Sequence, residues 1–362
     1  MSHAQRGTTM QNKANWRSLP VGRWGPTVRN KPNYPAERYC AKQSQFAAMG
    51  GGDGPGTWFG GGDRYNGPML IGLKFDIGFS QDEVYQRLFG AREILPFLRE
   101  LGVEVVETPV GPEVETLVLQ EHIARCVDAG LKLTLHPYSE GSVFNPAYFS
   151  PEEENPCRAL HERFFLLAAE AARRQQFPTV VNIHAAAGTS AEPRQYLLDQ
   201  SIAFFLWAHD WCRDNVPDVA VAVELQISPD PDEPRQHIGD SYGELLEISI
   251  ASDATACWDF GHAYWNTRRY GWPLHPPQAL IPRIGHVHCH DVCGDDHQPL
   301  VYNTVPWKDF LRLLILNDFD GRIILEVPPS EFLRAGGLHT LTASLAALRT
   351  WTEQCKSEAL LG

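Results

Sequence analysis

The sequence predicts an α/β protein, a (β/α)8 barrel with an irregular, glycine-rich N-terminal extension. Two observations lead to this fold class. Short apolar runs rich in β-branched residues alternate with longer amphipathic stretches, the pattern of parallel strands covered by helices. The first run is followed by DIGFSQDE rather than by the Gly-x-Gly-x-x-Gly turn that usually opens a doubly wound sheet. A closed barrel is therefore favoured over an open sheet.

The N-terminal extension covers residues 1–67 and shows little periodic hydrophobicity. The glycine-dense segments at 50–56 and 60–63 favour loops, because glycine has almost no backbone preference. We expect an irregular arm lying on the surface of a catalytic barrel domain at residues 68–362. The alternative is a lid that brings Trp58 or Phe59 to a pocket.

The barrel elements follow in order along the chain. The apolar runs predict strands at residues 69–75, 103–107, 131–136, 179–184, 219–226, 255–260, 284–288 and 322–327. The amphipathic stretches predict helices at residues 81–101, 113–129, 154–175, 194–214, 241–249, 306–316 and 337–351. Residues 264–283, after the sixth run, are expected to be mostly loop, with a short helix at most.

Composition restricts the possible partners. The net charge of −13 and the absence of a basic run argue against binding to nucleic acid or to anionic membranes. No apolar stretch approaches the roughly 20 residues that cross a bilayer, and the first residues lack the apolar core of a signal peptide. We therefore expect a cytoplasmic protein whose eight cysteines, none in a Cys-x-x-Cys pair, are free thiols.

Polar residues end the predicted strands, which is where barrel enzymes place their catalytic groups. The second to eighth strands end in a carboxylate or an imidazole: Glu107, His136, His184, Glu224, Asp259, His288 and Glu326. The first ends near Lys74 and Asp76. Charged groups at a barrel mouth cost desolvation energy unless a metal or a partner compensates. Carboxylates mixed with imidazole suit Mn²⁺, Mg²⁺, Co²⁺ or Zn²⁺.

In this order the motifs VAVELQ, WDFGHAYWN, HVHCHD and IILEVP resemble the xylose isomerase-like TIM barrel superfamily, over about residues 69–352. That superfamily includes sugar epimerases, inosose dehydratases and AP endonucleases. The resemblance implies one divalent metal ion held by the side chains that end strands five to eight, Glu224, Asp259, His288 and Glu326. It also implies that His262 binds substrate or a second metal.

The run GHVHCHDV places three histidines at alternate positions, so they start on one face of a strand. The resemblance makes His288 the ligand. We expect His286, one layer deeper, to be a hydrogen-bonded core residue and His290 to contact substrate. Asp291 is the candidate for orienting His288.

The resulting functional prediction is a divalent-metal-dependent isomerase, epimerase or lyase. Its substrate would be a small polyhydroxylated molecule, a sugar, keto-sugar or cyclitol, and the reaction proton abstraction next to a carbonyl. Glu224 and Glu326 would transfer the proton. The residues predicted to serve a leaving group, hold hydroxyls or wall the substrate are His184, His136, His262, Tyr138, Trp265 and Trp272.

The alternative is an AP endonuclease-like, metal-dependent phosphoesterase. The resemblance allows extra ions at His136, His184, Asp295 and His297. Two features argue against this alternative. The net charge is acidic, and Val301, Tyr302 and Asn303 replace the glycines that usually follow the Asp-x-His motif. A third possibility is a non-catalytic barrel that binds a ligand or a partner, and a homo-oligomer is possible in every case.

Overall fold

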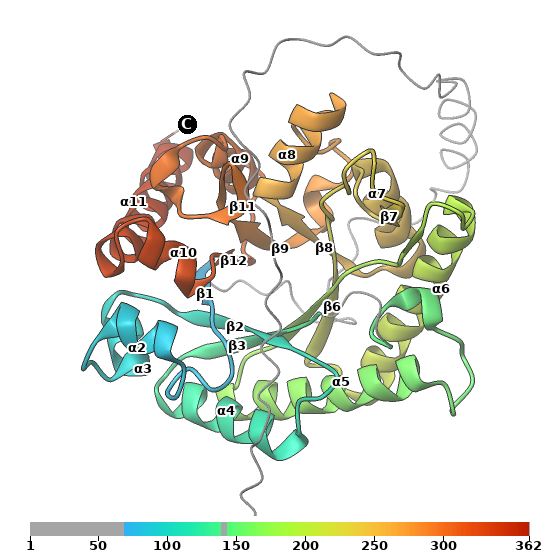
Figure 1. Cartoon of the computed structure of the whole chain (residues 1–362), viewed down its shortest axis with the longest axis horizontal. Coiled ribbons are helices and arrows are strands. Elements are labelled where there is room, and N and C mark those ends of the chain that lie inside the picture. Colours follow the sequence, from blue (N-terminus) through green and yellow to red (C-terminus); the bar gives the residue numbers. More distant parts are fainter. Residues whose placement is uncertain (1–68, 139–142, 362) are drawn as a thin grey trace, which may run out of the picture. The chain divides into compact units, whose positions relative to one another are not determined.

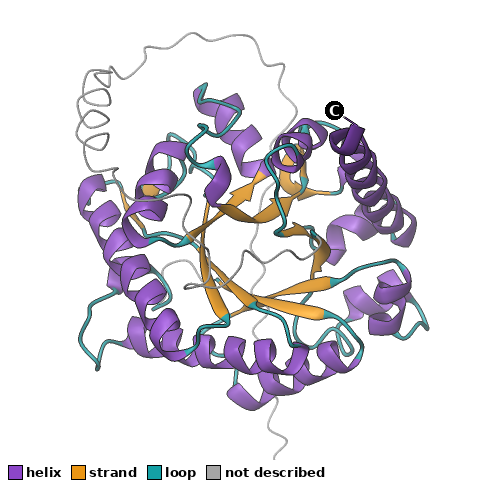
Figure 2. Ribbon diagram, turned by 180° about the vertical axis from the view of Figure 1, so that it is seen from behind, coloured by secondary structure: helices purple, strands orange, loops and turns teal. Residues whose placement is uncertain are grey.

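Eight parallel strands close into a barrel in the computed structural model, which describes residues 69–138 and 143–361. They pair in the order β1-β12-β9-β8-β6-β4-β3-β2 (Figures 1 and 2). Their bounds are β1 (Leu70–Lys74), β2 (Val105–Val110), β3 (Lys132–Pro137), β4 (Thr179–Ile183), β6 (Val219–Glu224), β8 (Thr255–Asp259), β9 (Ile284–Cys289) and β12 (Arg322–Leu325). Each overlaps one predicted run, so the predicted fold class is confirmed, although β2 continues three residues beyond Glu107, its predicted end. The predicted arm, with Trp58 and Phe59, falls outside the described residues.

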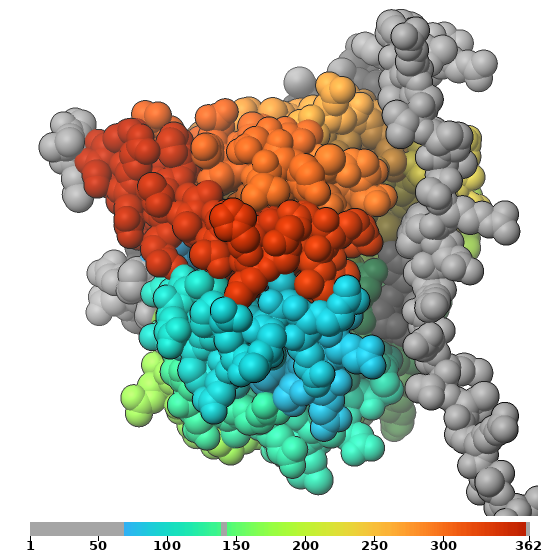
Figure 3. All heavy atoms as spheres, turned by 60° about the vertical axis from the view of Figure 1, so that its left-hand side comes forward, coloured from blue at the N-terminus to red at the C-terminus, as the bar shows by residue number. Residues whose placement is uncertain are grey.

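Helices cover the outside of the barrel (Figure 2). They are α2 (Glu83–Phe89), α3 (Ile94–Glu100), α4 (Thr116–Asp128), α5 (Pro156–Gln175), α6 (Arg194–Asn215), α7 (Tyr242–Ser252), α8 (Phe260–Tyr270), α9 (Trp307–Ile315), α10 (Pro329–Arg334) and α11 (Leu338–Leu361). In the space-filling view of Figure 3, the C-terminal helices in red lie directly against the α2–α3 segment in blue, which closes the helical ring. Among the described residues, no helix is long and apolar enough to cross a membrane.

Two element predictions are corrected. The stretch at 81–101 forms two helices, because Gly90 takes a positive φ of 64° and ends α2. The short helix allowed after the sixth strand starts earlier than the predicted segment, since α8 begins directly after β8 at Phe260, and the predicted loop follows at 271–280. Asp259 caps α8: its Oδ1 accepts the backbone N–H of His262 at 2.7 Å. Asp259 is thus both the last residue of β8 and the N-cap of α8, which fixes its side chain at the barrel mouth.

Two small two-stranded sheets stand on the loops and were not predicted. Strands β5 (Ala187–Thr189) and β7 (Arg235–His237) pair antiparallel although α6 and β6 lie between them in the chain, and β10 (Asp291–Cys293) and β11 (Asp295–Gln298) form a hairpin. The hairpin follows β9 after a single residue, His290. It therefore brings the segment 295–298 back toward the mouth.

Strand register stacks the inward side chains in layers. Leu70, Val105 and Ile324 pack together in a lower layer. Gly72 pairs in register with Val105 and Ile324, and a Cβ there would come within 2.5 Å of the Val105 carbonyl oxygen and 2.7 Å of Ile324 Cδ1. One step higher, Lys74 pairs in register with Glu107. Small residues and apolar packing below thus support a polar layer at the carboxyl ends of the strands.

Candidate metal centre

The four predicted ligands, Glu224, Asp259, His288 and Glu326, converge at the carboxyl ends of β6, β8, β9 and β12. One ligand atom from each residue lies within 4.8 Å of the others, and all four side chains are buried. His288 Nδ1 is 2.7 Å from Glu326 Oε2, 3.6 Å from Glu224 Oε2 and 3.7 Å from Asp259 Oδ2. The predicted ligands are therefore brought to one point by four strands that are distant in sequence.

The chemistry of this cluster fits one divalent cation. Nδ1 of His288 and Oε2 of Glu326 are buried 2.7 Å apart, yet within the described residues neither atom makes a hydrogen bond. Both residues belong to the four-ligand group that could hold an ion. Three carboxylates and one imidazole are the donor set that Mn²⁺, Mg²⁺, Co²⁺ and Zn²⁺ accept. Without a cation, so many buried anions would carry a large desolvation cost.

The carboxylate of Glu107 contacts Nε2 of His288, the ring nitrogen that does not face Glu326. Its Oε1 lies 2.7 Å from His288 Nε2, and its Oε2 lies 2.7 Å from Nε2 of His286. The Asn182 amide also approaches His288 Nε2, at 3.3 Å. A proton on Nε2 would face the Glu107 carboxylate and would leave the Nδ1 lone pair for an ion, so this is the tautomer that metal binding at the cluster requires.

This arrangement confirms one expectation and corrects another. His286 is fully buried and hydrogen-bonded, as predicted for a core histidine. Asp291 does not orient His288. Its carboxylate instead accepts the backbone N–H groups of Val292, Thr304 and Val305 and so ties the β10 strand to the segment that leads into α9. Glu107 had been noted only as a strand end, and no pattern in the sequence pairs it with β9.

Lys74 is a second residue whose role the sequence did not reveal. Its Nζ lies 3.1 Å from Oε1 of Glu326. Burial would lower the pKa of Lys74, but attraction to Glu326, Asp76 and Glu107 outweighs it and keeps the pKa above its ordinary value. Burial would likewise raise the pKa of Glu326, but the neighbouring cations hold it well below its ordinary range. Glu326 is thus an anion with one oxygen on Lys74 and the other facing the cluster.

His136 and His184 lie on the β3–β4 side of Glu224. Their Nε2 atoms are 3.6 Å and 3.4 Å from Glu224 Oε2, which also accepts the Asn182 amide at 2.6 Å. Nδ1 of His136 lies 2.9 Å from the Asn182 carbonyl, so that nitrogen donates and the Nε2 lone pair faces Glu224. Burial lowers the pKa of His136, which keeps the ring neutral. These three ligand atoms form another group able to hold an ion.

His262 lies on the other side of the cluster. Its Nδ1 donates to the Leu225 carbonyl at 2.9 Å, and its Nε2 is 3.4 Å from Asp296 Oδ2. Burial would lower the pKa of His262, but Asp259 and Asp296 raise it to about 9. His297 joins this side through Nε2, 3.3 Å from Glu326 Oε2. Asp295, predicted with His297 as an extra ligand pair, is exposed, and its neighbour Asp296 is the carboxylate that faces the histidines.

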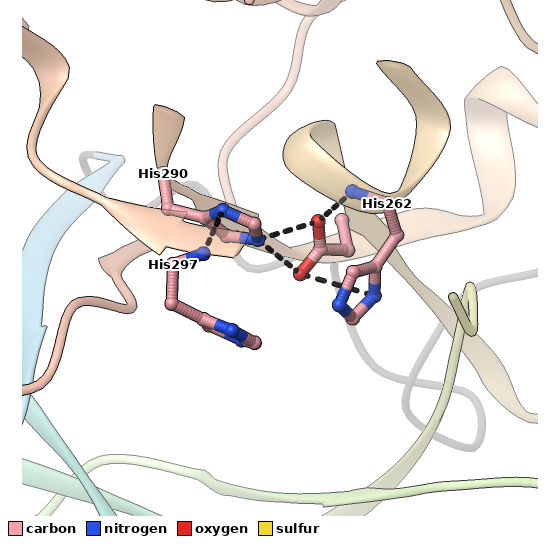
Figure 4. A group of neighbouring side chains, drawn as sticks. His262, His290 and His297 are labelled. Carbon is pink, nitrogen blue, oxygen red and sulfur yellow. Dashed lines mark hydrogen bonds and ion pairs between the residues drawn. The ribbon is translucent and has the colours of Figure 1, made fainter. Parts of the chain in front are cut away.

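His290 does not occupy the predicted substrate-contact position. Its side chain is fully buried, and Nε2 lies 3.0 Å and 3.1 Å from the two oxygens of Asp259 (Figure 4). Figure 4 also shows the His290 ring above that of His297, with His262 on the far side of the carboxylate. The register of the histidine run was correct for His286 and His288, but the chain turns into the β10–β11 hairpin directly after His290.

The three aromatic residues predicted to line a substrate pocket, Tyr138, Trp265 and Trp272, lie in different surroundings. The Tyr138 ring meets that of His184 edge-on at 4.9 Å, and both line a pocket with Phe144, Pro146 and Gln226. Tyr138 is therefore placed to contact a molecule in this pocket, beside His184. Trp265 lies one turn beyond His262 on α8, under the Arg269 guanidinium, and Trp272 stacks on Tyr270. Neither tryptophan lines that pocket, so their predicted substrate contacts remain untested.

Comparison with known proteins agrees with this geometry. The family model described as "Xylose isomerase-like TIM barrel" matches residues 95–351. Among solved structures, a D-tagatose 3-epimerase-like protein is 17% identical with a TM-score of 0.54, covering 80% of this chain and 99% of that protein. D-Psicose 3-epimerase from Clostridium cellulolyticum is 11% identical with a TM-score of 0.54 and the same two coverages.

A xylose isomerase domain protein from Alicyclobacillus acidocaldarius is 17% identical with a TM-score of 0.51, covering 79% of this chain and 99% of that protein. No curated protein sequence matches the chain. At sequence identities this low, similarity to these solved structures shows a shared fold and not a shared function. The family model, in contrast, spans most of the chain and includes all four converging side chains. The chain belongs to the xylose isomerase-like TIM barrel family.

Proposed function

We propose that this protein is a divalent-metal-dependent isomerase, epimerase or lyase that acts on a sugar, keto-sugar or cyclitol by abstracting a proton next to a carbonyl. The observation that carries the proposal is the convergence of Glu224, Asp259, His288 and Glu326 at the barrel mouth. Two of the structural relatives are named for 3-epimerisation of the ketoses D-tagatose and D-psicose, which supports this substrate class.

A divalent ion at this site would polarise the substrate carbonyl and acidify the adjacent C–H. Glu224 and Glu326 reach the cluster from β6 and β12 and are the proposed proton acceptor and donor. The pKa of each is held well below its ordinary range, because neighbouring cationic groups outweigh the effect of burial. Each is therefore a weak base, and the transfer depends on the acidified C–H.

Surrounding residues have supporting roles in this proposal. His184 is the partly exposed member of its group, so it is placed to hold a substrate hydroxyl or to protonate a leaving group. His136, deeper, would offer its Nε2 lone pair to an ion shared with Glu224. Tyr138 would form the apolar wall beside His184. His262 keeps the predicted role of a second-metal or hydroxyl-binding residue through the Nε2 that faces Asp296. A cytoplasmic location and a homo-oligomer stay predictions of the sequence.

The test is proton exchange in D₂O. Mn²⁺-loaded protein would be incubated with free ketoses and cyclitols, and deuterium at each carbon measured by mass spectrometry and NMR. We expect deuterium at the carbon next to the carbonyl, and loss of that exchange in Glu224→Gln and Glu326→Gln. Glu121→Gln, an exposed change on α4, is the matched control. Product that forms without C–H exchange and with oxygen taken from water would reject proton-transfer chemistry.

A second candidate is the metal-dependent phosphoesterase, and one observation favours it. Two further groups flank the four-ligand cluster, His136 with His184 and Glu224, and Asp259 with His262, His290 and His297. In each, the ligand atoms lie within 4.8 Å of one another, so the mouth has donors for more than one ion. The net charge of −13 still argues against a nucleic-acid substrate.

Metal stoichiometry and a nicking assay separate the two functions. One tightly bound ion per chain, with no cleavage of an abasic-site duplex at low salt, is the expected result for proton-transfer chemistry. Three zinc ions per chain together with metal-dependent nicking would transfer the assignment to the phosphoesterase.

A further inference from the structure

We propose that His290 is a positioning residue that fixes the carboxylate of Asp259 through an Nε2–H hydrogen bond and binds neither an ion nor substrate itself. The inference rests on the proposed metal centre, in which Asp259 is a ligand. It assigns to His290 a role different from the substrate contact predicted from the sequence, and different from membership of a second ion site.

The surroundings of His290 leave no room for substrate. The side chain is fully buried. One face of the ring stacks on His297, with ring centroids 4.4 Å apart and planes inclined by 19°. On another side the ring contacts the backbone of Gly261, where an added Cβ would lie 1.9 Å from His290 Cε1. His290 thus fills a slot built by the start of α8 and the β10–β11 hairpin.

Hydrogen bonding fixes which nitrogen carries the proton. The backbone N–H of His297 donates to His290 Nδ1 at 3.1 Å, and the Asp291 carbonyl lies at the same distance from Nδ1. Only one of these contacts can be a hydrogen bond in a given tautomer. A proton on Nε2 allows both the His297 bond and a bond to Asp259. A proton on Nδ1 would point at the backbone N–H of His297, so that two donors would face each other. The Nε2 lone pair would then face the carboxylate of Asp259. The Nε2–H tautomer is therefore favoured.

With that tautomer, Asp259 receives two donors. Its Oδ1 accepts the His262 backbone N–H at 2.7 Å from the helix side, and the His290 Nε2–H approaches from the strand side at 3.0 Å from Oδ1 and 3.1 Å from Oδ2. Two donors from different elements set both the rotation and the tilt of the carboxylate. Its Oδ2 then points toward Nδ1 of His288, 3.7 Å away, which is the direction of the four-ligand cluster. Ligands held in this way bind metal more tightly than ligands that must be ordered first.

Gly261 gives independent support. It is the second residue of α8 and its φ is not positive, so the backbone there does not require glycine. Alanine stabilises a helix more than glycine does, so glycine at this position lowers the helix propensity of the segment. The space taken by the His290 ring explains the choice, since any side chain at Gly261 would displace the ring from Asp259.

The test compares two replacements that resemble His290 in shape. In His290→Gln the amide nitrogen takes the place of Nε2 and can still donate to Asp259. In His290→Asn the amide nitrogen takes the place of Nδ1 and cannot. Mn²⁺ affinity of the purified full chain is measured by isothermal titration calorimetry after chelator treatment, and thermal unfolding without metal reports on the fold. We expect the Asn variant to bind Mn²⁺ about 10- to 100-fold more weakly, and the Gln variant to stay within about threefold of the wild type.

Gly261→Ala supplies a second route that leaves His290 intact. Alone it should weaken Mn²⁺ binding about as much as His290→Asn, because the methyl group displaces the ring. Combined with His290→Ala it should add nothing, because no ring remains to displace. Equal Mn²⁺ affinity in the wild type and both His290 variants would overturn the inference while leaving the metal centre standing. Loss of one whole equivalent of Mn²⁺ in both would make His290 a ligand and overturn it as well. A wild type that binds no Mn²⁺ would overturn the proposed function and this inference together.

Discussion

Replacing Glu107 should weaken metal binding although Glu107 is not itself a proposed ligand. Its two oxygens each lie 2.7 Å from an imidazole nitrogen, Nε2 of His286 and Nε2 of His288. Attraction to both rings overcomes the effect of burial and holds the pKa of Glu107 below its ordinary range. Glu107 thus acts as an anion that keeps the His288 proton on Nε2 and leaves Nδ1 for the ion.

The size of the effect depends on the replacement. In Glu107→Gln the amide oxygen can still accept from His288, and the amide N–H₂ can donate to His286, whose proton can move to the unpartnered Nδ1. Only the charge is lost, and we expect about a 10-fold loss in Mn²⁺ affinity. In Glu107→Leu nothing fixes the His288 tautomer, and about 100-fold is expected, or roughly 2.7 kcal/mol.

Calorimetric titration of metal-free protein with Mn²⁺ measures these affinities. Thermal unfolding before titration identifies variants that fail to fold. Thr134→Val is the matched control, since it removes only the hydroxyl that donates to Glu107 at 3.2 Å and should change the affinity little. If Glu107→Leu folds and binds Mn²⁺ as tightly as the wild type, Glu107 does not position His288 and the tautomer argument is wrong.

Three further outcomes follow from the structure. His262 has a pKa raised from 6.5 to about 9, so its contribution to the stability of metal-free protein is fully present below pH 6.5 and is lost as the pH rises through 9. The contribution of His262 is on the order of 3 kcal/mol, and urea denaturation should detect a decline with rising pH that is smaller in His262→Gln. Asp291→Ala leaves the backbone donors of Thr304 and Val305 unpaired and should cost about 1–3 kcal/mol of folding free energy, with Mn²⁺ affinity changed less than in Glu107→Leu. Gly72→Ala overfills the barrel below the mouth and should cost about 1–3 kcal/mol, measured by the same denaturation; an unchanged midpoint would mean that the lower layer is loosely packed.

Strand positions and most ligands were predictable because both follow from periodicity. A strand buried on two faces reads as a continuous apolar run, and in a parallel barrel all such runs end on the same face. A polar residue that ends each of several successive runs must therefore meet the others. This reasoning placed the seven strand-end residues on one face, and the family resemblance selected Glu224, Asp259, His288 and Glu326 among them as ligands. The structure shows that these four side chains converge.

Contacts across the barrel and beyond the strand ends were not predictable. Glu107 on β2 meets His288 on β9 across the lumen, a pairing set by barrel closure rather than by local sequence. The surroundings of His290 and Asp291 were not anticipated, because the chain reverses at Gly294, with a φ of 79°, into the β10–β11 hairpin. Asn182 is the missed residue with the clearest signal: it is a polar residue two positions before His184 in an apolar run, so it starts on the same face.

The central claim is that four side chains from β6, β8, β9 and β12 hold one divalent ion. The most direct test is a crystal structure of Mn²⁺-soaked protein with anomalous diffraction recorded at the manganese edge. We expect a peak about 2.1 Å from Nδ1 of His288 and within bonding distance of Glu224, Asp259 and Glu326, with Nε2 of His288 on Glu107. A fully soaked crystal with no anomalous peak among these four residues, or an ion bound through Nε2 of His288, would contradict it.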